Sequence, residues 1–566
     1  MRGKWWQEAV IYEIYPRSFY DANGDGIGDL QGIIQKLDYL KDLGVTAIWI
    51  CPFYRSPMDD NGYDVSDFYS VAEEYGTMDD LKALIAELHK RDMKLIVDLV
   101  LNHTSDEHPW FIESRKSVDN PYRDFYIWRK GNNGQPPTNW ESFFGGSVWE
   151  YDETTGYYYM HIFSKKMPDL NWRNPKLRQE MYRMINWYLE LGVDGFRVDA
   201  VAHLSKNWEF PNHEPIPGKE YVACYHEFSN RPEVHDYIRE MNAHTMNRYP
   251  DVVTIGEAGG ASLEDTLKYC AYDRNEFHML IQFDHCWLDT DPSSAPYVPD
   301  KWTWKALDLR DLKRSFKKYQ QGLYGKVWNT IYWSNHDQPR ILSHYGTEGE
   351  QWEVCGKMLA TVLYMQGGTP IIYQGEEIGM MNVKFEHLTD YRDVEIFTLY
   401  EETVGKGLAS HEEMMERIHR RSRDNARTPM QWSDEPYAGF STSEPWIKVN
   451  PNYKQINVEE QLKREDSLLN YYKKLFRIRQ STPTLIYGDF KLYLEHDENV
   501  VLYTRSDKEE TYMILCNFFD RHVTVEIPED IEVQNVTLIL SNIRDCALQR
   551  QMHLLPYEAL VYRLNA

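Results

Sequence analysis

Between residues 10 and 375 the chain alternates short apolar segments with amphipathic segments of helical period, and this alternation limits the possible folds more than any other feature. The apolar segments have the length of buried strands, and the intervening segments place apolar residues on one helix face. Predicted strands cover residues 10–16, 47–52, 94–103, 195–201, 252–257, 278–284, 329–335 and 369–375. Predicted helices cover residues 30–43, 78–91, 174–191, 231–248, 309–322 and 353–366. Eight strands interleaved with helices indicate an α/β fold, a parallel (β/α)8 barrel.

Two stretches depart from this alternation. Residues 104–173 are rich in Trp and Asn and contain no clear helical pattern, so we expect an inserted domain after the third strand. Residues 484–566 change to a period of two, which is typical of an antiparallel β-domain. The predicted division is therefore a barrel formed by residues 1–103 and 174–483, the inserted domain, and the C-terminal β-domain.

The charge balance restricts the possible partners. A net charge of −26 over 566 residues argues against nucleic acid and against anionic membranes, and favours a small neutral substrate. The 18 Trp and 41 Tyr residues are a mild indication of sugar binding, although aromatic residues more often fill cores. The seven cysteines are scattered, which predicts reduced thiols in a cytoplasmic protein. The sequence shows no apolar leader and no run of about 18 apolar residues, which also predicts a cytoplasmic location. We expect a monomer or weak homo-oligomer.

Two charged residues stand in the fourth predicted strand. Arg197 and Asp199 are two positions apart, so on an extended strand their side chains point to the same face. One interpretation is a structural salt bridge at the end of a buried strand. The other is a carboxylate nucleophile held ionised by the adjacent guanidinium.

Further acidic residues end other predicted strands. Glu257 ends the fifth strand, and Asp337 follows the seventh in the segment SNHD. In a parallel barrel the strands' C-terminal ends meet at one mouth, so Asp199, Glu257 and Asp337 should converge there. Paired carboxylates about 5–5.5 Å apart are the catalytic groups of retaining glycosidases, one as nucleophile and one as acid/base.

These motifs resemble those of the α-amylase family of glycoside hydrolases, and within it the oligo-1,6-glucosidase/α-glucosidase branch. The resemblance extends over essentially the whole chain. The shared motifs are DLVLNH at residues 98–103, GFRVD at 195–199, GE at 256–257, NHD at 335–337, NGYD at 61–64 and RDNARTPMQW at 423–432. It implies a retaining, exo-acting α-glucosidase that releases glucose from the non-reducing ends of short α-glucosides. A catalytically dead homologue is disfavoured because all three acids are present.

The resemblance also implies catalytic roles. Asp199 would be the nucleophile, Glu257 the general acid/base, and Asp337 would steady the developing oxocarbenium ion. Arg197 would keep Asp199 ionised and oriented. Glu257 would need a raised pKa in order to donate its proton near neutral pH.

The remaining implied residues bind the same terminal glucose. His103 and His336 would bind its hydroxyls, and Tyr63 would stack on its face. Asp64 and Arg423 would pair across the closed end of the pocket. This closure would restrict the enzyme to terminal glucose units.

Two departures from the family pattern bear on linkage. Ala200 follows the nucleophile where α-1,6-specific members typically carry valine, which favours α-1,4 bonds, and Met167 replaces a common glutamine. A size difference of this kind is worth about 1–3 kcal/mol. We therefore expect α-1,4 bonds to be preferred, with an oligo-1,6-glucosidase (isomaltase) as the alternative.

Two further alternatives are less favoured. Trehalose-6-phosphate hydrolysis needs a cationic pocket, for which Lys206 is a weak candidate. Sucrose isomerisation is disfavoured because the arginine-rich segment of such relatives does not occur near residues 330–345.

A loop near the N-terminus predicts a metal site. Oxygen-bearing residues alternate with glycines between residues 21 and 29, as calcium requires, but a full EF-hand is excluded by the missing glutamate at position twelve. A polar loop of Asx turns is the alternative. The resemblance implies a structural calcium ion, and no organic cofactor, with ligands Asp21, Asn23, Asp25, Asp29 and the carbonyl of Ile27.

Overall fold

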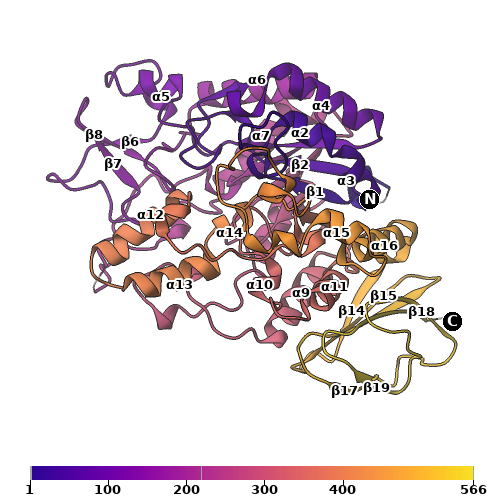
Figure 1. Ribbon diagram of the computed structural model, residues 1–566. Coiled ribbons are helices and arrows are strands. Elements are labelled where there is room, and N and C mark those ends of the chain that lie inside the picture. The colour runs from indigo at the N-terminus through magenta and orange to yellow at the C-terminus, as the bar shows by residue number, and fades with distance from the viewer. Residues whose placement is uncertain (1–2, 218, 565–566) are drawn as a thin grey trace.

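The computed structural model describes residues 3–217 and 219–564, and at its centre is a barrel of eight parallel strands (Figure 1). In order around the barrel the strands are β1 (Ile11–Ile14), β2 (Ala47–Ile50), β5 (Lys94–Val100), β9 (Gly195–Asp199), β10 (Val253–Glu257), β11 (Met279–Ile281), β12 (Thr330–Ile331) and β13 (Thr369–Tyr373). β13 pairs with β1, and Thr330 Oγ1 of β12 donates to the Leu280 carbonyl of β11 at 2.8 Å. The predicted (β/α)8 barrel is confirmed.

Helices cover the outside of the barrel. They are α2 (Leu30–Gln35), α3 (Leu37–Leu43), α4 (Met78–Lys90), α6 (Pro175–Leu191), α7 (Glu233–His244), α8 (Leu263–Cys270), α9 (Leu309–Leu323), α11 (Trp352–Tyr364) and α16 (Leu468–Ser481). The helix predicted for residues 30–43 is divided at Lys36, whose ψ of 3° lies outside the helical range. The sequence analysis did not predict α8, which begins with a capping box formed by Ser262 and Asp265.

The sixth and seventh strands are shorter than predicted. β11 ends at Ile281 and β12 at Ile331, because side-chain hydrogen bonds replace the backbone ladder beyond those points. Tyr332 Oη donates to the Gln282 carbonyl at 2.7 Å, and His285 Nε2 lies 2.7 Å from the Tyr332 carbonyl. The segments after Ile281 and Ile331 therefore continue as loops toward the mouth of the barrel.

The segment inserted after β5 contains the antiparallel sheet β6–β8–β7 (Trp128–Arg129, Tyr157–Met160, Trp149–Asp152). It also contains a short helix, α5 (Pro109–Ser114), so the expectation of a segment without a helix is wrong. Pro109 occupies the first helical turn and the His108 ring accepts from the Trp110 N–H, and both favour a helix start. A bridge between His103 and Asp169 connects the segment to the end of β5.

A second excursion follows β13 and was not separated from the barrel by the sequence. It carries α12 (Val394–Tyr400), α13 (His411–Arg421), α14 (Asp424–Arg427) and α15 (Val458–Leu462). In Figure 1 these orange helices lie between the inserted sheet and the C-terminal strands. The excursion brings Asp393, Arg423 and Arg427 to the barrel mouth.

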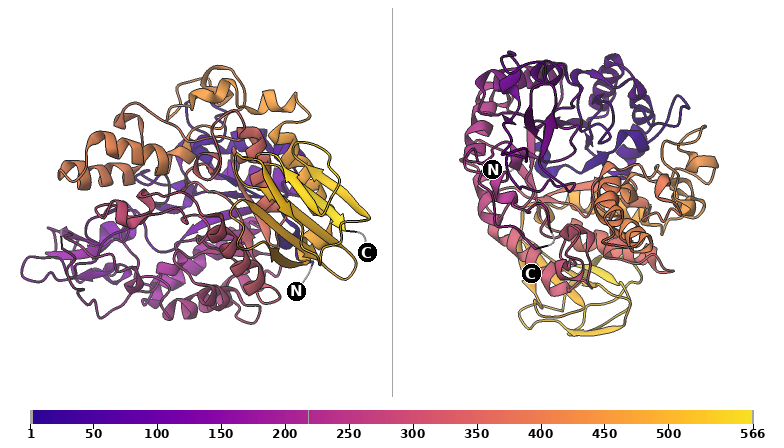
Figure 2. Two further views of the ribbon diagram at one scale, coloured as in Figure 1. Left: turned by 90° about the horizontal axis from the view of Figure 1, so that it is seen from below. Right: turned by 90° about the vertical axis from the view of Figure 1, so that its left-hand side faces the viewer.

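The C-terminal strands form an antiparallel sheet in the order β14–β15–β16–β20–β18. Their bounds are Asp489–Tyr493, Val500–Ser506, Thr511–Asn517, Ala559–Leu564 and Val536–Ser541, and β17 (Val523–Glu526) pairs with β19 (Gln551–Leu554). In Figure 2 this yellow sheet lies at the end of the molecule remote from the inserted domain. Lys313 of α9 joins it to the barrel by donating to the carbonyls of Leu494, Asp497 and Val500.

All seven cysteines are free thiols. Within the described ranges, no helix combines the length and apolar character needed to cross a bilayer.

Candidate active site

The three predicted catalytic acids share one cavity at the C-terminal end of the barrel. Asp199 and Glu257 are the last residues of β9 and β10, and Asp337 follows β12. All three line a cavity of about 640 Å³. The cavity wall away from the strands is aromatic and includes Phe143, Phe144, Phe163, Tyr225 and Trp287.

Arg197 connects the catalytic acids beneath the cavity floor. Its Nη1 lies 2.9 Å from Asp199 Oδ1 and 2.8 Å from both carboxylate oxygens of Asp98, and its Nη2 pairs with Glu257. Tyr63 and Trp49 donate to the same Asp98 oxygen at 3.0 and 3.2 Å. The guanidinium is fully buried, which supports the interpretation as a structural salt bridge, and the role of Asp199 as nucleophile stays a prediction. Arg197 forms a structural ion pair with Asp98 and at the same time orients Asp199.

Arg197 favours the ionised form of Asp199, as expected, but it does not determine the pKa of this carboxyl. Burial raises the pKa of Asp199 to about 7, with a further contribution from the charges of Asp98 and Asp337. Arg197 and His336 oppose this rise without cancelling it. Burial is the largest contribution, and Arg197, which opposes it, also contacts Asp98 and Glu257.

Asp337 has the opposite electrostatic environment. Burial disfavours its charge, but His336, Arg423 and Arg427 outweigh burial and hold its pKa well below the ordinary value. Arg427 Nη2 lies 2.8 Å from Asp337 Oδ1, and Arg423 Nη1 lies 3.4 Å from the same atom. Asp337 is therefore a permanent negative charge in the cavity. The sequence places Arg427 in a shared motif without assigning it a role, and the structure identifies it as a partner of Asp337.

Of the predicted glucose-binding residues, Tyr63, His103 and Ala200 line the cavity. The Nε2 atom of His103 is buried without a hydrogen-bond partner among the described residues, and burial lowers the pKa of this ring to about 3. A neutral ring with an unused nitrogen can bond a sugar hydroxyl. Ala200 has a φ of 46°, a left-handed conformation that is uncommon for alanine.

His336 lies beneath the cavity and does not line it. Its Nδ1 is 2.6 Å from Glu13 Oε1, its Nε2 is 3.3 Å from Asp337 Oδ2, and its ring stacks on Tyr63 with centroids 5.1 Å apart. Neighbouring acidic groups overcome burial and hold its pKa well above the ordinary value. In the described structure His336 thus supports Asp337 and Tyr63 from below.

The predicted pairing of Asp64 with Arg423 is wrong. Asp64 is fully buried, and its carboxylate accepts the backbone N–H groups of Asp59 and Asp60 at 2.8 and 3.0 Å. Asp60 is instead the residue that lines the cavity and lies 2.8 Å from Arg423 Nη2. Asp64 shapes the turn that presents Asp60. The sequence motif pointed to the correct loop but not to the correct acid, because which carboxylate faces the pocket depends on the turn.

Asp393 also binds Arg423. Its two carboxylate oxygens lie 2.9 and 2.5 Å from the guanidinium, and Asp393 is fully buried. Arg423 is therefore held by both Asp393 and Asp60, and Asp60 and Arg423 line the cavity. Neither acid was among the residues predicted from the sequence.

Lys206 does not provide a phosphate site. Its ammonium is buried, lies 2.8 Å from Asp169 Oδ2 and donates to Asn102 Oδ1 at 2.6 Å. The cavity lining instead contains Lys219 and Lys301, and the latter pairs with Glu395. Met167 also lines the cavity.

In the predicted metal loop, aspartate side chains accept hydrogen bonds from nearby backbone N–H groups. Asp21 accepts the N–H groups of Gly24 and Gly26 at 2.7 and 2.8 Å, and Asp29 accepts those of Ala22 and Gly32 at 3.0 and 2.6 Å. Burial, and to a smaller extent the charge of Asp21, raises the pKa of Asp29. The five predicted ligands would all bind a metal through oxygen atoms of carboxylate or carbonyl groups, and such ligands suit a hard cation. The hydrogen bonds also fit the Asx-turn alternative.

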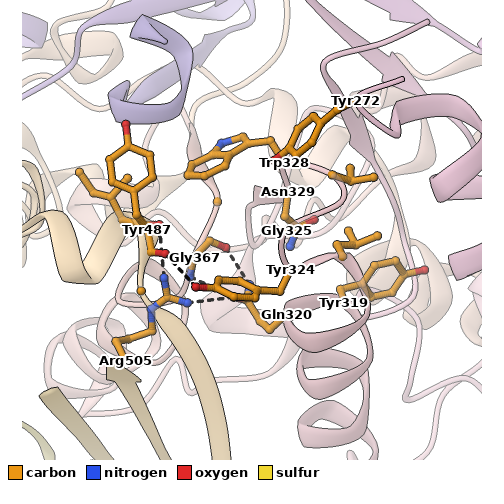
Figure 3. Close-up of a pocket in the computed structure, with 15 residues that line it drawn as sticks. Tyr272, Tyr319, Gln320, Tyr324, Gly325, Trp328, Asn329, Gly367, Tyr487 and Arg505 are labelled. Atoms are coloured by element: carbon orange, nitrogen blue, oxygen red, sulfur yellow. Dashed lines mark hydrogen bonds between the residues drawn. The ribbon is translucent and has the colours of Figure 1, made fainter. Parts of the chain in front are cut away.

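A second hollow lies at the other end of the barrel, next to the C-terminal domain (Figure 3). In Figure 3 Trp328, Tyr324 and Tyr487 surround it, and Arg505 lies at its base. None of its lining residues is Asp or Glu. Arg505 donates to backbone carbonyls of Leu485 and Ile486 at 3.3 Å. Without a carboxylate this hollow cannot perform glycosidase chemistry, so the cavity with three acids is the candidate active site.

Comparison with known proteins identifies the family of the chain. The profile described as alpha amylase, catalytic domain, matches residues 13–488. The chain belongs to the α-amylase family. It is a glycoside hydrolase, and its similarity to known members extends over its full length.

Among its relatives, the chain is 49% identical to an oligo-1,6-glucosidase of Parageobacillus thermoglucosidasius, with 100% of both chains covered. It is 44% identical to an α-glucosidase of Pediococcus pentosaceus, with 99% of each covered. A solved isomaltulose synthase mutant of Erwinia rhapontici NX5 superposes with a TM-score of 0.95 at 42% identity, with 100% of both chains covered.

The raised pKa of Asp199 predicts a distinct pH profile. If Asp199 must be ionised to react, kcat/KM should fall on the acid side with an apparent pKa near 7. The substitution Asp98→Asn removes a negative charge that raises this pKa, so the acid limb should move to lower pH. The exposed Asp119→Asn provides a matched control that should leave the profile unchanged. A folded Asp98→Asn variant with the wild-type profile would contradict this account.

The arrangement of Asp60 and Asp64 predicts different effects of two similar substitutions. Asp60→Asn weakens the closed end of the pocket, so kcat/KM should fall roughly tenfold or more, about 1.4 kcal/mol. Asp64→Asn keeps one acceptor for the turn and should mainly lower stability, by about 1–2 kcal/mol. Steady-state kinetics and thermal unfolding of both variants distinguish these outcomes. A larger loss of kcat/KM in Asp64→Asn, with a loss of stability in Asp60→Asn, would identify Asp64 as the pocket residue.

Proposed function

We propose that the enzyme is an exo-acting oligo-1,6-glucosidase that releases glucose from the non-reducing ends of short α-glucosides. The observation that carries the proposal is a cavity lined by three acids and by the ion pair of Asp60 and Arg423, which would close one end of it. A closed end accepts a chain terminus and excludes the middle of a polymer. The relatives named above include an oligo-1,6-glucosidase at 49% identity, which supports the α-1,6 linkage over the α-1,4 preference expected from Ala200.

In the proposed reaction Asp199 attacks the anomeric carbon of the terminal glucose. The bond from that carbon to the glycosidic oxygen breaks, and Glu257 donates its proton to the departing oxygen. Water then attacks the glucosyl-enzyme ester, transfers a proton to Glu257 and releases Asp199. The configuration at the anomeric carbon is retained because two inversions occur.

The residues around the acids would stabilise the positive charge that develops on the sugar. Asp337, whose pKa lies well below the ordinary value, would supply a fixed negative charge. Tyr63 would present its ring to the glucose, and His103 would use its free Nε2 for a hydroxyl. Arg197 would hold Asp199 in line for attack.

Hydrolysis of α-1,4 bonds is the second candidate, and one specific observation favours it. Ala200 lines the cavity directly beside Asp199, and its small side chain leaves room that a valine would fill. The alanine also adopts a left-handed backbone conformation, where a β-branched residue is strained. The variant Ala200→Val tests how far this position governs linkage.

Initial rates of glucose release from isomaltose and maltose, measured side by side, decide between the two linkages. We expect isomaltose to be cleaved faster, and Ala200→Val to increase the ratio of isomaltose to maltose rates by about tenfold or less. Asp199→Ala should abolish both activities while preserving the fold. Faster cleavage of maltose would support the α-1,4 assignment. Activity on neither sugar would reject both and direct the search to phosphorylated or sucrose-like substrates.

We also propose that the loop of residues 21–29 binds a structural calcium ion. Asp21, Asn23, Asp25, Asp29 and the Ile27 carbonyl would be its ligands, and the raised pKa of Asp29 supports the idea because a cation would relieve the buried charge. The ion would stabilise the loop, whose Asp21 also binds Ser441 at 2.6 Å. It would take no part in bond cleavage.

Calcium removal should therefore reduce stability rather than catalysis. Chelation with EGTA should lower the unfolding temperature, and added calcium should restore it. Asp21→Asn should show a low unfolding temperature that no longer responds to either treatment. An unfolding temperature of the wild type that does not change with chelator or calcium would favour the Asx-turn interpretation.

A further inference from the structure

We propose that His213, His226 and Glu227 bind a divalent transition-metal ion of the zinc class. These residues lie on the long connection between β9 and α7, outside the set of catalytic acids. One ligand atom from each residue lies within 4.8 Å of the other two. Imidazole nitrogen and carboxylate oxygen are the ligands that zinc takes, commonly with water in a remaining position.

The spacing of the ligand atoms suits a tetrahedral ion. Glu227 Oε1 lies 3.0 Å from His213 Nε2 and 3.4 Å from His226 Nε2. Bonds of 2.0–2.1 Å at tetrahedral angles place neighbouring ligand atoms roughly 3.3 Å apart. An ion can therefore be accommodated with only small side-chain adjustments.

Glu227 is already oriented for such a role. Asn207 Nδ2 donates to its other oxygen, Oε2, at 2.7 Å, and Arg231 Nη1 lies 3.6 Å from that oxygen. These partners leave Oε1 directed toward the two histidines. Metal ligands are typically fixed by such outer hydrogen bonds.

The site is accessible to an ion from solvent. The His226 side chain is 70% exposed, whereas Glu227 is buried. Another group of potential ligands, Glu13, Cys51 and His336, is fully buried beneath the catalytic acids and belongs to the active site. Of these two groups among the described residues, the one formed by His213, His226 and Glu227 is the one that an ion can reach from solvent.

The position of the site indicates a structural consequence. His213 is fixed to the inserted domain, because its N–H donates to Asn139 Oδ1 at 3.0 Å and its carbonyl accepts from Asn139 Nδ2 at 2.8 Å. Between His213 and His226 lie Lys219, Ala223 and Tyr225, which line the active-site cavity. A bound ion would join the two ends of this stretch and brace the outer wall of the cavity.

Zinc titration of the full-length enzyme tests the proposal without relying on activity. The protein is stripped with EDTA, supplied with excess calcium to saturate the loop of residues 21–29, and titrated with zinc chloride by calorimetry. We expect one zinc ion per chain, with affinity reduced at least about tenfold in His213→Ala, His226→Ala and Glu227→Gln. The exposed His496→Ala, in the C-terminal domain, is the matched control and should bind as the wild type does.

A crystal measured at the zinc absorption edge should show an anomalous peak between the three side chains. The proposal is overturned if the wild type binds no zinc under these conditions, or if His226→Ala binds as tightly as the wild type. Because the His226 side chain is largely exposed, this variant should fold even if the substitution at His213 disturbs the loop. The two proposals can be tested separately, because zinc binding at this site would support the inference whichever linkage the enzyme prefers.

Discussion

The active site depends on one buried guanidinium. Arg197 contacts Asp98, Asp199 and Glu257 from the interior of the barrel, where an isolated charge of either sign would be very costly. Arg197 is therefore shared among three acidic side chains. Burial, together with the charges of Asp98 and Asp337, raises the pKa of Asp199, whereas His336, Arg423 and Arg427 hold the pKa of Asp337 low. The pKa values of Asp199 and Asp337, which line the same cavity, are thus shifted in opposite directions.

The contacts of Arg423 at the cavity are assembled from segments that are remote in the chain. Asp60 comes from the connection after β2, and Arg423 and Asp393 come from the excursion after β13. The barrel provides a rigid rim on which these loops meet, which is why a fold of this kind can change its specificity through loops alone. The inserted domain completes the cavity with aromatic side chains, among them Phe143 and Phe163.

The connection between β9 and α7 links catalysis to a second region of the molecule. It begins directly after Asp199, lines the outer cavity and is joined to the inserted domain by hydrogen bonds to Asn139. Any ligand that joins the two ends of this connection acts on the wall that faces the substrate. A metal ion held by His213, His226 and Glu227 would have this effect without contact with the reacting atoms.

The sequence by itself determined the barrel and the positions of Asp199, Glu257 and Asp337, because strand periodicity and strand ends are local properties that a parallel barrel converts into a shared mouth. It also located the loops that close the pocket. Only the tertiary structure decided that Asp60 rather than Asp64 faces Arg423, since that choice depends on a turn held by backbone hydrogen bonds. The same holds for the short β11 and β12, for the burial of His336 and Lys206, and for the pKa of Asp199. These features arise from contacts between distant segments and from the sum of several charges, which no single stretch of sequence contains.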